Sequence, residues 1–169
     1  MTILETERLT LRKITLDDAA FMLDLLNQPS FIQFIGDRGV RTLDDARRII
    51  EDRYLAAYER LGFGIYLTQL RGTSVPIGIC GLVKRDGLDN VDIGYAFLPQ
   101  YWSKGYASEA ASAVLGYARS TLGMKRILGI TIPGNTSSIR VLEKIGLKFE
   151  RMIRLPGEET DLKLFSSEV

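Results

Sequence analysis

Three apolar segments separated by two short turns constrain the fold of this chain more than any other feature. The segments span residues 64–71, 76–84 and 90–98, and the turns between them carry Gly72-Thr73-Ser74 and Asp86-Gly87. Connections this short join strands in antiparallel fashion, because a parallel crossover needs a dozen or more residues. The centre of the sequence therefore predicts an antiparallel meander, which argues against a Rossmann-type nucleotide-binding fold built from βαβ crossovers.

The spacing of apolar residues on either side of the meander predicts further helices and strands, which together with the meander form a layered fold. Residues 6–14 alternate as a half-exposed strand does, and residues 31–39 are expected to form an aromatic, glycine-containing loop. The other predicted elements are helices over residues 15–26, 42–61, 105–121 and 135–145, and strands over residues 126–131, 147–155 and 160–165. The resulting order, β-α-α-β-β-β-α-β-α-β-β, predicts an α/β (α+β) fold with a mixed, mostly antiparallel sheet and helices on both faces. We expect a single domain over residues 1–169.

The absence of histidine excludes several classes of active site. No imidazole is available as a general base, or for a Ser/His or Cys/His pair. Catalytic zinc and iron sites usually use histidine as a ligand, so we expect no metal site. The single cysteine, Cys80, lies in the apolar run 77–83 and is expected to be buried rather than nucleophilic.

Charge and hydropathy argue against nucleic-acid and membrane partners. The chain has 22 basic and 21 acidic side chains, a net charge of +1, and no basic stripe. No apolar run approaches the roughly 18 residues of a membrane span. The N-terminus carries Glu5, Glu7 and Arg8 where a signal peptide would be apolar. We therefore expect a cytoplasmic protein that is a monomer or a homodimer.

The segment over residues 100–110 joins the last strand of the meander to the predicted helix 105–121. Small residues at such a junction leave several main-chain N–H groups unpaired, at the positive end of the helix dipole. Gly105 and Ala107 would let a ligand approach the main chain closely. The combination is typical of a phosphate-binding site, although a plain strand-to-helix turn has the same local pattern.

Three further motifs in register with this segment resemble those of a known family. They are Thr6-Glu7-Arg8-Leu9-Thr10-Leu11-Arg12, Asp92-Ile93-Gly94-Tyr95 and Asn135-Thr136-Ser137-Ser138-Ile139-Arg140-Val141-Leu142-Glu143-Lys144-Ile145-Gly146-Leu147. Together they resemble the GNAT superfamily of acyl-CoA-dependent N-acetyltransferases, and in particular its RimJ/RimL-like branch. The resemblance covers nearly the whole chain and implies the GNAT fold, with acetyl-CoA as co-substrate.

The resemblance also implies which residues bind acetyl-CoA. In the family, the loop follows the pattern Gln/Arg-x-x-Gly-x-Gly/Ala, occupied here by residues 102–107, with Trp102 in place of Gln or Arg and Ser103 in place of a common Gly. The N–H groups of residues 103–108 would hold the pyrophosphate, and Lys104 would add charge. The preceding strand would pair with the pantetheine arm, and an N–H near Leu98 would face the thioester oxygen. The implied binding residues are Tyr95, Ala96, Phe97, Leu98, Trp102, Ser103, Lys104, Gly105, Tyr106, Ala107, Ser108, Asn135 and Ser138.

Two catalytic candidates follow from the same resemblance. Asp92 occupies a position where RimJ/RimL-like proteins often carry Glu or Asp, and we expect it to take the amine proton, directly or through water. The alternative for Asp92 is a solvated or ion-paired strand residue. Many GNAT enzymes place a tyrosine acid where this chain has Leu142, so Ser138 or a water would protonate the thiolate. For Asn135 and Ser138, helix capping is the alternative role.

The expected activity is direct transfer of an acetyl group to a primary amine in a ternary complex. The resemblance puts a protein N-terminal amine first as the acceptor and a small-molecule amine second. We expect the acceptor pocket at residues 31–38 and at the turn around Glu158 and Glu159, whose acidic groups would suit a cationic amine or would simply keep a loop hydrated. The alternative function is a non-enzymatic acyl-CoA-binding regulatory module.

Overall fold

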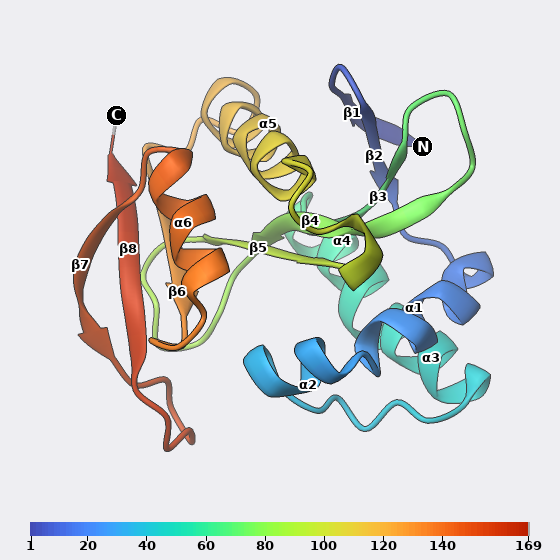
Figure 1. The fold of residues 1–169 in the computed structure, drawn as a ribbon, viewed down its shortest axis with the longest axis horizontal. Coiled ribbons are helices and arrows are strands. Elements are labelled where there is room, and N and C mark those ends of the chain that lie inside the picture. Colours follow the sequence, from blue (N-terminus) through green and yellow to red (C-terminus); the bar gives the residue numbers. More distant parts are fainter. Residues whose placement is uncertain (169) are drawn as a thin grey trace.

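A single eight-stranded sheet organises the computed structural model, which describes residues 1–168 (Figure 1). The spatial order is β1-β2-β3-β4-β5-β6-β8-β7. Only β5 and β6 pair in parallel among the described strands. The strands are β1 (Thr2–Glu5), β2 (Leu9–Lys13), β3 (Ile65–Leu70), β4 (Pro76–Val83), β5 (Asp92–Phe97), β6 (Arg126–Thr131), β7 (Lys148–Ile153) and β8 (Leu162–Glu168). The predicted antiparallel meander is thus confirmed as β3-β4-β5.

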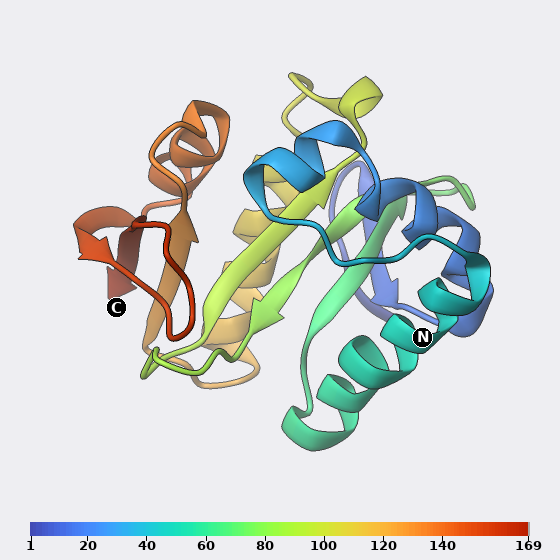
Figure 2. The same ribbon diagram turned by 90° about the horizontal axis from the view of Figure 1, so that it is seen from below.

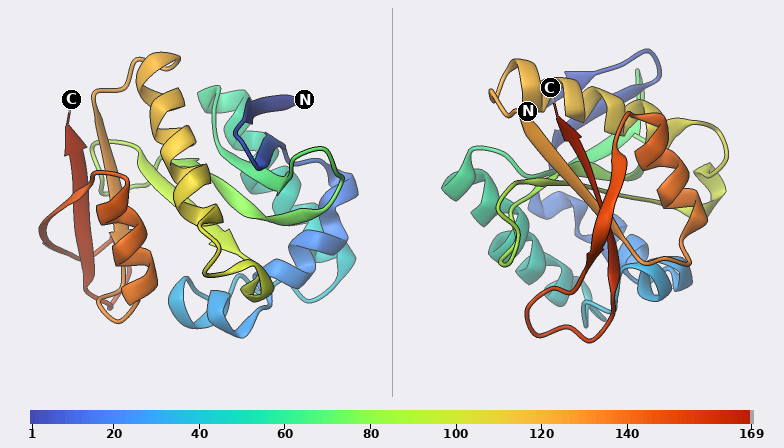
Figure 3. Two further views of the ribbon diagram at one scale, coloured as in Figure 1. Left: turned by 45° about the horizontal axis from the view of Figure 1, so that its top comes forward. Right: turned by 90° about the vertical axis from the view of Figure 1, so that its left-hand side faces the viewer.

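Helices cover both faces of the sheet, and each face has its own apolar core. The helices are α1 (Ala19–Leu26), α2 (Pro29–Phe34), α3 (Leu43–Ile49), α4 (Ala56–Leu61), α5 (Tyr106–Ser120) and α6 (Thr136–Lys144), with short 3-10 helices at Leu16–Asp18 and Pro99–Tyr101. Figures 1 and 3 show α5 lying across the central strands and α6 beside β6 and β8. Helices α1 to α4 cover the opposite face, where Leu67 and Ile79 meet Met22 and Ile50 in one buried cluster.

The structure differs from the sequence prediction in three places. Strand β1 is absent from the prediction because its four residues are too few to show a period, yet they pair with β2. Pro29 begins a further helix, α2, since proline fits the first turn of a helix, so the predicted loop 31–39 begins as helix. The predicted helix 42–61 contains a π-helical segment, Ile50–Leu55, between α3 and α4. Elsewhere the boundaries agree to within a few residues.

Strands β5 and β6 meet at one end and then diverge, as Figure 2 shows. Their register within the described chain consists of Asp92 opposite Leu128, with the Leu128 N–H donating to the Val91 carbonyl at 2.9 Å. Beyond Asp92, the edge of β5 therefore has no strand beside it on the β6 side. This divergence opens the centre of the sheet and positions the site.

No helix within residues 1–168 is both long enough and apolar enough to cross a lipid bilayer. Cys80 lies in β4 and is fully buried, and burial raises the pKa of its thiol. A nucleophilic thiolate is therefore not available at this position.

Candidate active site

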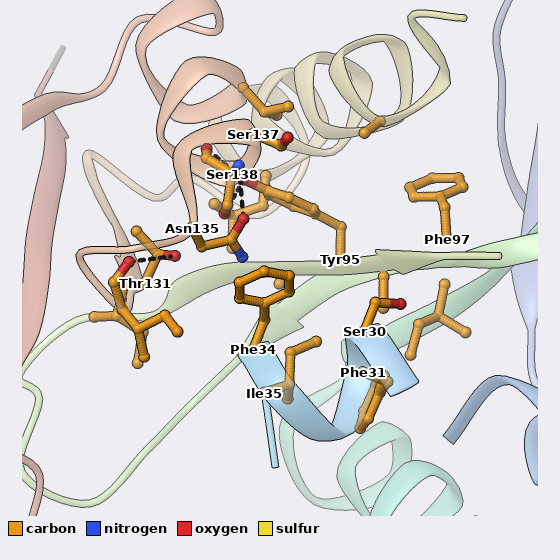
Figure 4. Close-up of a pocket in the computed structure, with 18 of the residues that line it drawn as sticks. Ser30, Phe31, Phe34, Ile35, Tyr95, Phe97, Thr131, Asn135, Ser137 and Ser138 are labelled. Atoms are coloured by element: carbon orange, nitrogen blue, oxygen red, sulfur yellow. Dashed lines mark hydrogen bonds between the residues drawn. The ribbon is translucent and has the colours of Figure 1, made fainter. Parts of the chain in front are cut away.

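A cavity of about 910 Å³ occupies the divergence between β5 and β6. The segment over residues 101–108 closes one end, the start of α6 lies on one side of β5, and α2 lies on the other. In Figure 4, Tyr95 reaches from β5 toward Ser138 of α6, while Phe34 and Ile35 approach the strand from the α2 side. The cavity thus connects both faces of the sheet around an unpaired strand edge.

The loop before α5 presents a run of free main-chain donors to this cavity. Ser103 (φ 61°) and Gly105 (φ 84°) both adopt the left-handed conformation, which is typical of main-chain nests that bind anions. The first helical bond runs from the Glu109 N–H to the Gly105 carbonyl at 3.0 Å. Within the described chain, the N–H groups of residues 103–108 donate to no protein acceptor. Together with the helix dipole, these N–H groups form an anion-binding site of the kind that binds phosphate.

The N-terminal motif, residues 6–12, holds this loop in place through contacts with Lys104 and with the first turn of α5. Glu109, in the first turn of α5, accepts hydrogen bonds from the Thr6 hydroxyl, from the Arg8 N–H at 3.0 Å and from Arg8 Nε at 2.7 Å. Arg8 Nη1 also donates to the Lys104 carbonyl at 2.9 Å, and the guanidinium stacks 4.5 Å from the centre of the Tyr106 ring. No local sequence pattern indicates these contacts, because Arg8 and Glu109 are 101 positions apart. Lys104 itself does not line the cavity, so its proposed charge contribution has no support from its position.

The free edge of β5 lies at Tyr95 and Phe97 rather than at Leu98. The Leu98 N–H donates to the Ile77 carbonyl at 2.9 Å, and Leu98 is buried away from the cavity. Main-chain groups of successive strand residues point to opposite sides, so Tyr95 and Phe97 turn theirs toward the cleft. Leu98 itself therefore does not supply the N–H expected near this position, because the register with β4 uses its N–H, and the nearest group on the free edge is that of Phe97. Trp102 Nε1 donates to the Phe97 carbonyl at 2.8 Å and so ties the loop to the strand end.

Tyr95, Ser138 and Asn135 form a hydrogen-bonded group at the start of α6 (Figure 4). The Tyr95 hydroxyl lies 2.9 Å from Ser138 Oγ and 3.0 Å from the Ser138 carbonyl, and burial raises its pKa. Asn135 Oδ1 accepts from the Ser138 N–H at 3.2 Å, so Asn135 is the helix cap. Leu142, at the position where the family resemblance led us to look for a tyrosine acid, is buried on the face of α6 that packs against β6. Because Leu142 has no proton to donate, the Tyr95–Ser138 pair, a neighbouring hydroxyl such as that of Ser137, or water would supply any proton near the start of α6.

Asp92 lies at the other end of the cavity and on the other face of the sheet. Its side chain is 1% exposed, and its Oδ1 accepts from Arg85 Nε at 2.9 Å. Its Oδ2 is buried and has no hydrogen-bond partner among the described residues. Burial raises the pKa of this carboxyl to about 6, against the opposing effect of Arg85. A carboxylate with one fixed oxygen, one free oxygen and such a pKa is suited to accept a proton near neutral pH.

Strand alternation explains the placement of the two catalytic candidates. Asp92 shares its face of β5 with Ala96, which packs against the α1–α4 core, whereas Ile93, Tyr95 and Phe97 pack against α5 and α6. Asp92 and Ser138 thus approach the cleft from opposite sides. A group bound at the β5 edge would have a base on one side and a hydroxyl on the other.

The predicted acceptor region also lines the cavity, with additions that the sequence did not indicate. Residues 31–36, Arg38 and Glu158 are part of the lining, and Glu159 is not. Arg53 and Arg85 join them from the π-helical segment and from the loop after β4. Their convergence depends on chain topology, for which no local pattern exists.

The cavity fits a nucleotide-tailed thioester on three grounds. Free donors at a helix start suit a pyrophosphate, an unpaired strand edge suits an amide-containing arm, and the cavity leads from both to a buried carboxylate. Within residues 1–168, no cluster of three or more His, Cys, Asp or Glu side chains could hold a metal ion.

Comparisons with known proteins agree with this geometry. The acetyltransferase (GNAT) domain model matches residues 8–148. An uncharacterized N-acetyltransferase, YoaA of Bacillus subtilis, is 30% identical over 90% of this chain and 86% of its own length. The crystal structure of a GNAT-family acetyltransferase from Bacillus anthracis superposes with a TM-score of 0.80, at 30% identity, covering 99% of this chain and 98% of that one.

The fold extends to more distant acetyltransferases. RimL, a ribosomal alpha-N-protein acetyltransferase solved in complex with coenzyme A, superposes with a TM-score of 0.80 at 16% identity, covering 100% of this chain and 98% of that one. The match of the family model over most of the chain, together with these relatives, shows that the protein belongs to the GNAT family of acetyltransferases.

Proposed function

We propose that the protein transfers an acetyl group from acetyl-CoA to a primary amine, either a protein N-terminal amine or the amine of a small molecule. The observation that carries the proposal is the continuity of the cavity. One cleft joins the free N–H groups of residues 103–108 to the buried carboxyl of Asp92, which is part of its lining, across the open edge of β5.

Acetyl-CoA would supply the acetyl group as an activated thioester. The N–H groups of residues 103–108 would bind its pyrophosphate, and the main-chain groups of Tyr95 together with the Phe97 N–H would hold its pantetheine arm, since the Phe97 carbonyl already accepts from Trp102. A free N–H at this edge would also stabilise negative charge that develops on the carbonyl oxygen during transfer. Trp102 and Arg8 would act indirectly, by fixing the loop to the strand end and to the N-terminal motif.

Asp92 would accept the proton that the amine must lose. An N-terminal amine has a pKa near 8, so its deprotonation at pH 7 costs about 1.4 kcal/mol, and a lysine amine costs about 4–5 kcal/mol. The carboxylate approaches from the α2 side of the sheet, which is also the side on which residues 31–36 line the cavity. The amine would therefore enter from this side.

The leaving thiolate would lie on the Tyr95–Ser138 side. Because a thiol with a pKa near 8.5 leaves fairly readily, proton donation there contributes less than proton removal at Asp92. Cys80 is buried within β4, which supports direct transfer without an acyl-enzyme.

We expect CoA release that depends on an added amine when wild-type protein is incubated with labelled acetyl-CoA. The measurement is a screen of N-terminal peptides and small amines, scored by label transfer to the amine. Acetyl-CoA binding with only slow, amine-independent hydrolysis would contradict the proposal and favour an acyl-CoA-binding regulatory module.

A further inference from the structure

Three arginines converge on the Asp92 end of the cavity from separate parts of the chain. Arg38 follows α2, Arg53 lies in the π-helical segment, and Arg85 follows β4, and all three line the cavity. The acidic side chains in the lining are Asp92 and Glu158. This end of the site therefore carries more positive than negative charge, the reverse of what a purely cationic acceptor would need.

Only one of the three guanidinium groups has a carboxylate of its own among the described residues. Arg85 pairs with Asp92 at 2.9 Å. The guanidinium groups of Arg38 and Arg53 make no hydrogen bond and no ion pair with any described residue. Both are only partly exposed, so their charges are not simply dispersed in bulk solvent.

These charges act on one another within a single small region. Burial, together with the positive charges of Arg53 and Arg85, lowers the pKa of Arg38, against the weaker opposing effects of Tyr54 and Glu158. The positive charge of Arg53 opposes the rise that burial causes in the pKa of the Asp92 carboxyl. Arg38 and Arg53 have the same opposing effect on the pKa of the buried Tyr54, which lines the same cavity. Like charges held together in a partly desolvated pocket favour the binding of an anion, and guanidinium groups are particularly suited to carboxylates and phosphates.

We propose that the acceptor amine carries a carboxylate, which Arg38 and Arg53 bind while Asp92 faces the amine. The inference rests on the proposed acetyltransferase function and specifies the chemical class of its acceptor. Because Asp92, Arg38 and Arg53 line one cavity, the carboxyl and the two guanidinium groups would bind opposite ends of one molecule. A carboxylate could belong to a small amino acid or to an acidic side chain near a peptide N-terminus.

The test compares acceptors that differ only in the anionic group. One arm uses the peptides Ala-Glu-Ala-amide and Ala-Gln-Ala-amide, and the other uses 4-aminobutyrate and 4-aminobutanol. We expect the wild type to favour the carboxylate member of at least one pair by about 10-fold or more in kcat/KM. The arm with the larger preference identifies the peptide or the small molecule as the source, and added salt should reduce the preference.

Variants then connect the preference to the two arginines. Arg38→Gln or Arg53→Gln should reduce it to about two-fold or less, and Arg38→Lys should retain part of it because the charge remains. Arg60→Gln is the matched control, since Arg60 is exposed on α4 and does not line the cavity. Melting temperatures show whether each variant is folded.

The outcomes separate this inference from the function on which it rests. Equal acetylation of both members of each pair, or a preference unaffected by Arg38→Gln and Arg53→Gln, would overturn the inference and leave the acetyltransferase function standing. No amine-dependent turnover with any acceptor would overturn both.

Discussion

Replacing Asp92 with asparagine is expected to lower kcat/KM for amine acetylation by about 100-fold to 10,000-fold at pH 7.5, the usual effect of removing a general base. Asparagine keeps the shape of the side chain and can still accept from Arg85, but its amide cannot take a proton. The effect is measured from initial rates of CoA release at saturating acetyl-CoA, after a melting curve has shown that the variant is folded.

The pH dependence of activity distinguishes a proton-accepting role of Asp92 from a purely structural one, because a structural role would leave the pH profile unchanged. Because burial raises the pKa of Asp92 to about 6, the carboxyl becomes protonated as the pH falls through that value, and wild-type activity should fall with it. The asparagine variant should lack this break and should differ least from the wild type below pH 6. Asp89→Asn is the matched control, since Asp89 is exposed in the preceding turn and should keep the wild-type profile. An Asp92→Asn profile that still breaks near pH 6 would remove Asp92 from the mechanism.

Replacing Gly105 with aspartate is expected to weaken acetyl-CoA binding by at least about 100-fold, equivalent to about 2.8 kcal/mol. The new carboxylate would lie among the donors that we assign to the pyrophosphate, and two unit charges 4 Å apart repel by about 4 kcal/mol at an effective dielectric constant near 20. A side chain here would also meet Arg8, since a Cβ at this position lies 3.3 Å from Nη2. Isothermal titration with acetyl-CoA measures the affinity.

Gly123→Asp provides the matched control for backbone strain and charge. Gly123 also has a positive φ, 69° compared with 84° at Gly105, and a Cβ added at Gly123 would have no neighbouring atom within 4 Å. Both variants should therefore have a similar conformational cost, and only the Gly105 variant should lose affinity. Equal affinities for the two variants would show that the loop before α5 does not bind the phosphates.

Much of the fold could be predicted from the sequence because turns and helix starts are determined by residues close together in the chain. The turns at residues 72–74 and 86–87 fix the meander, and the small residues before α5 mark the free helix start. The motif at residues 135–138 similarly indicates a helix start, and Asn135 caps α6. Features confined to one segment were therefore predictable.

Features that depend on pairing between distant segments were not. The Leu98 N–H is used by Ile77 because of the β4–β5 register, which shifts the free edge to Tyr95 and Phe97. The grouping of Arg38, Arg53 and Arg85 depends on how three elements pack around the end of β5, and none of the three lies in a recognisable motif. For this reason the sequence suggested acidic groups for the acceptor end, whereas the structure has an excess of arginines there.

Chemical-shift changes of the amide groups, followed by NMR during titration with coenzyme A, test the location of the coenzyme-binding site most directly. We expect the largest shifts at the N–H groups of residues 103–108 and at Tyr95 and Phe97, with little change at Leu98, whose N–H is already bonded to Ile77. Saturable binding that leaves residues 103–108 unperturbed, with the shifts located elsewhere in the chain, would contradict the assignment of this cleft.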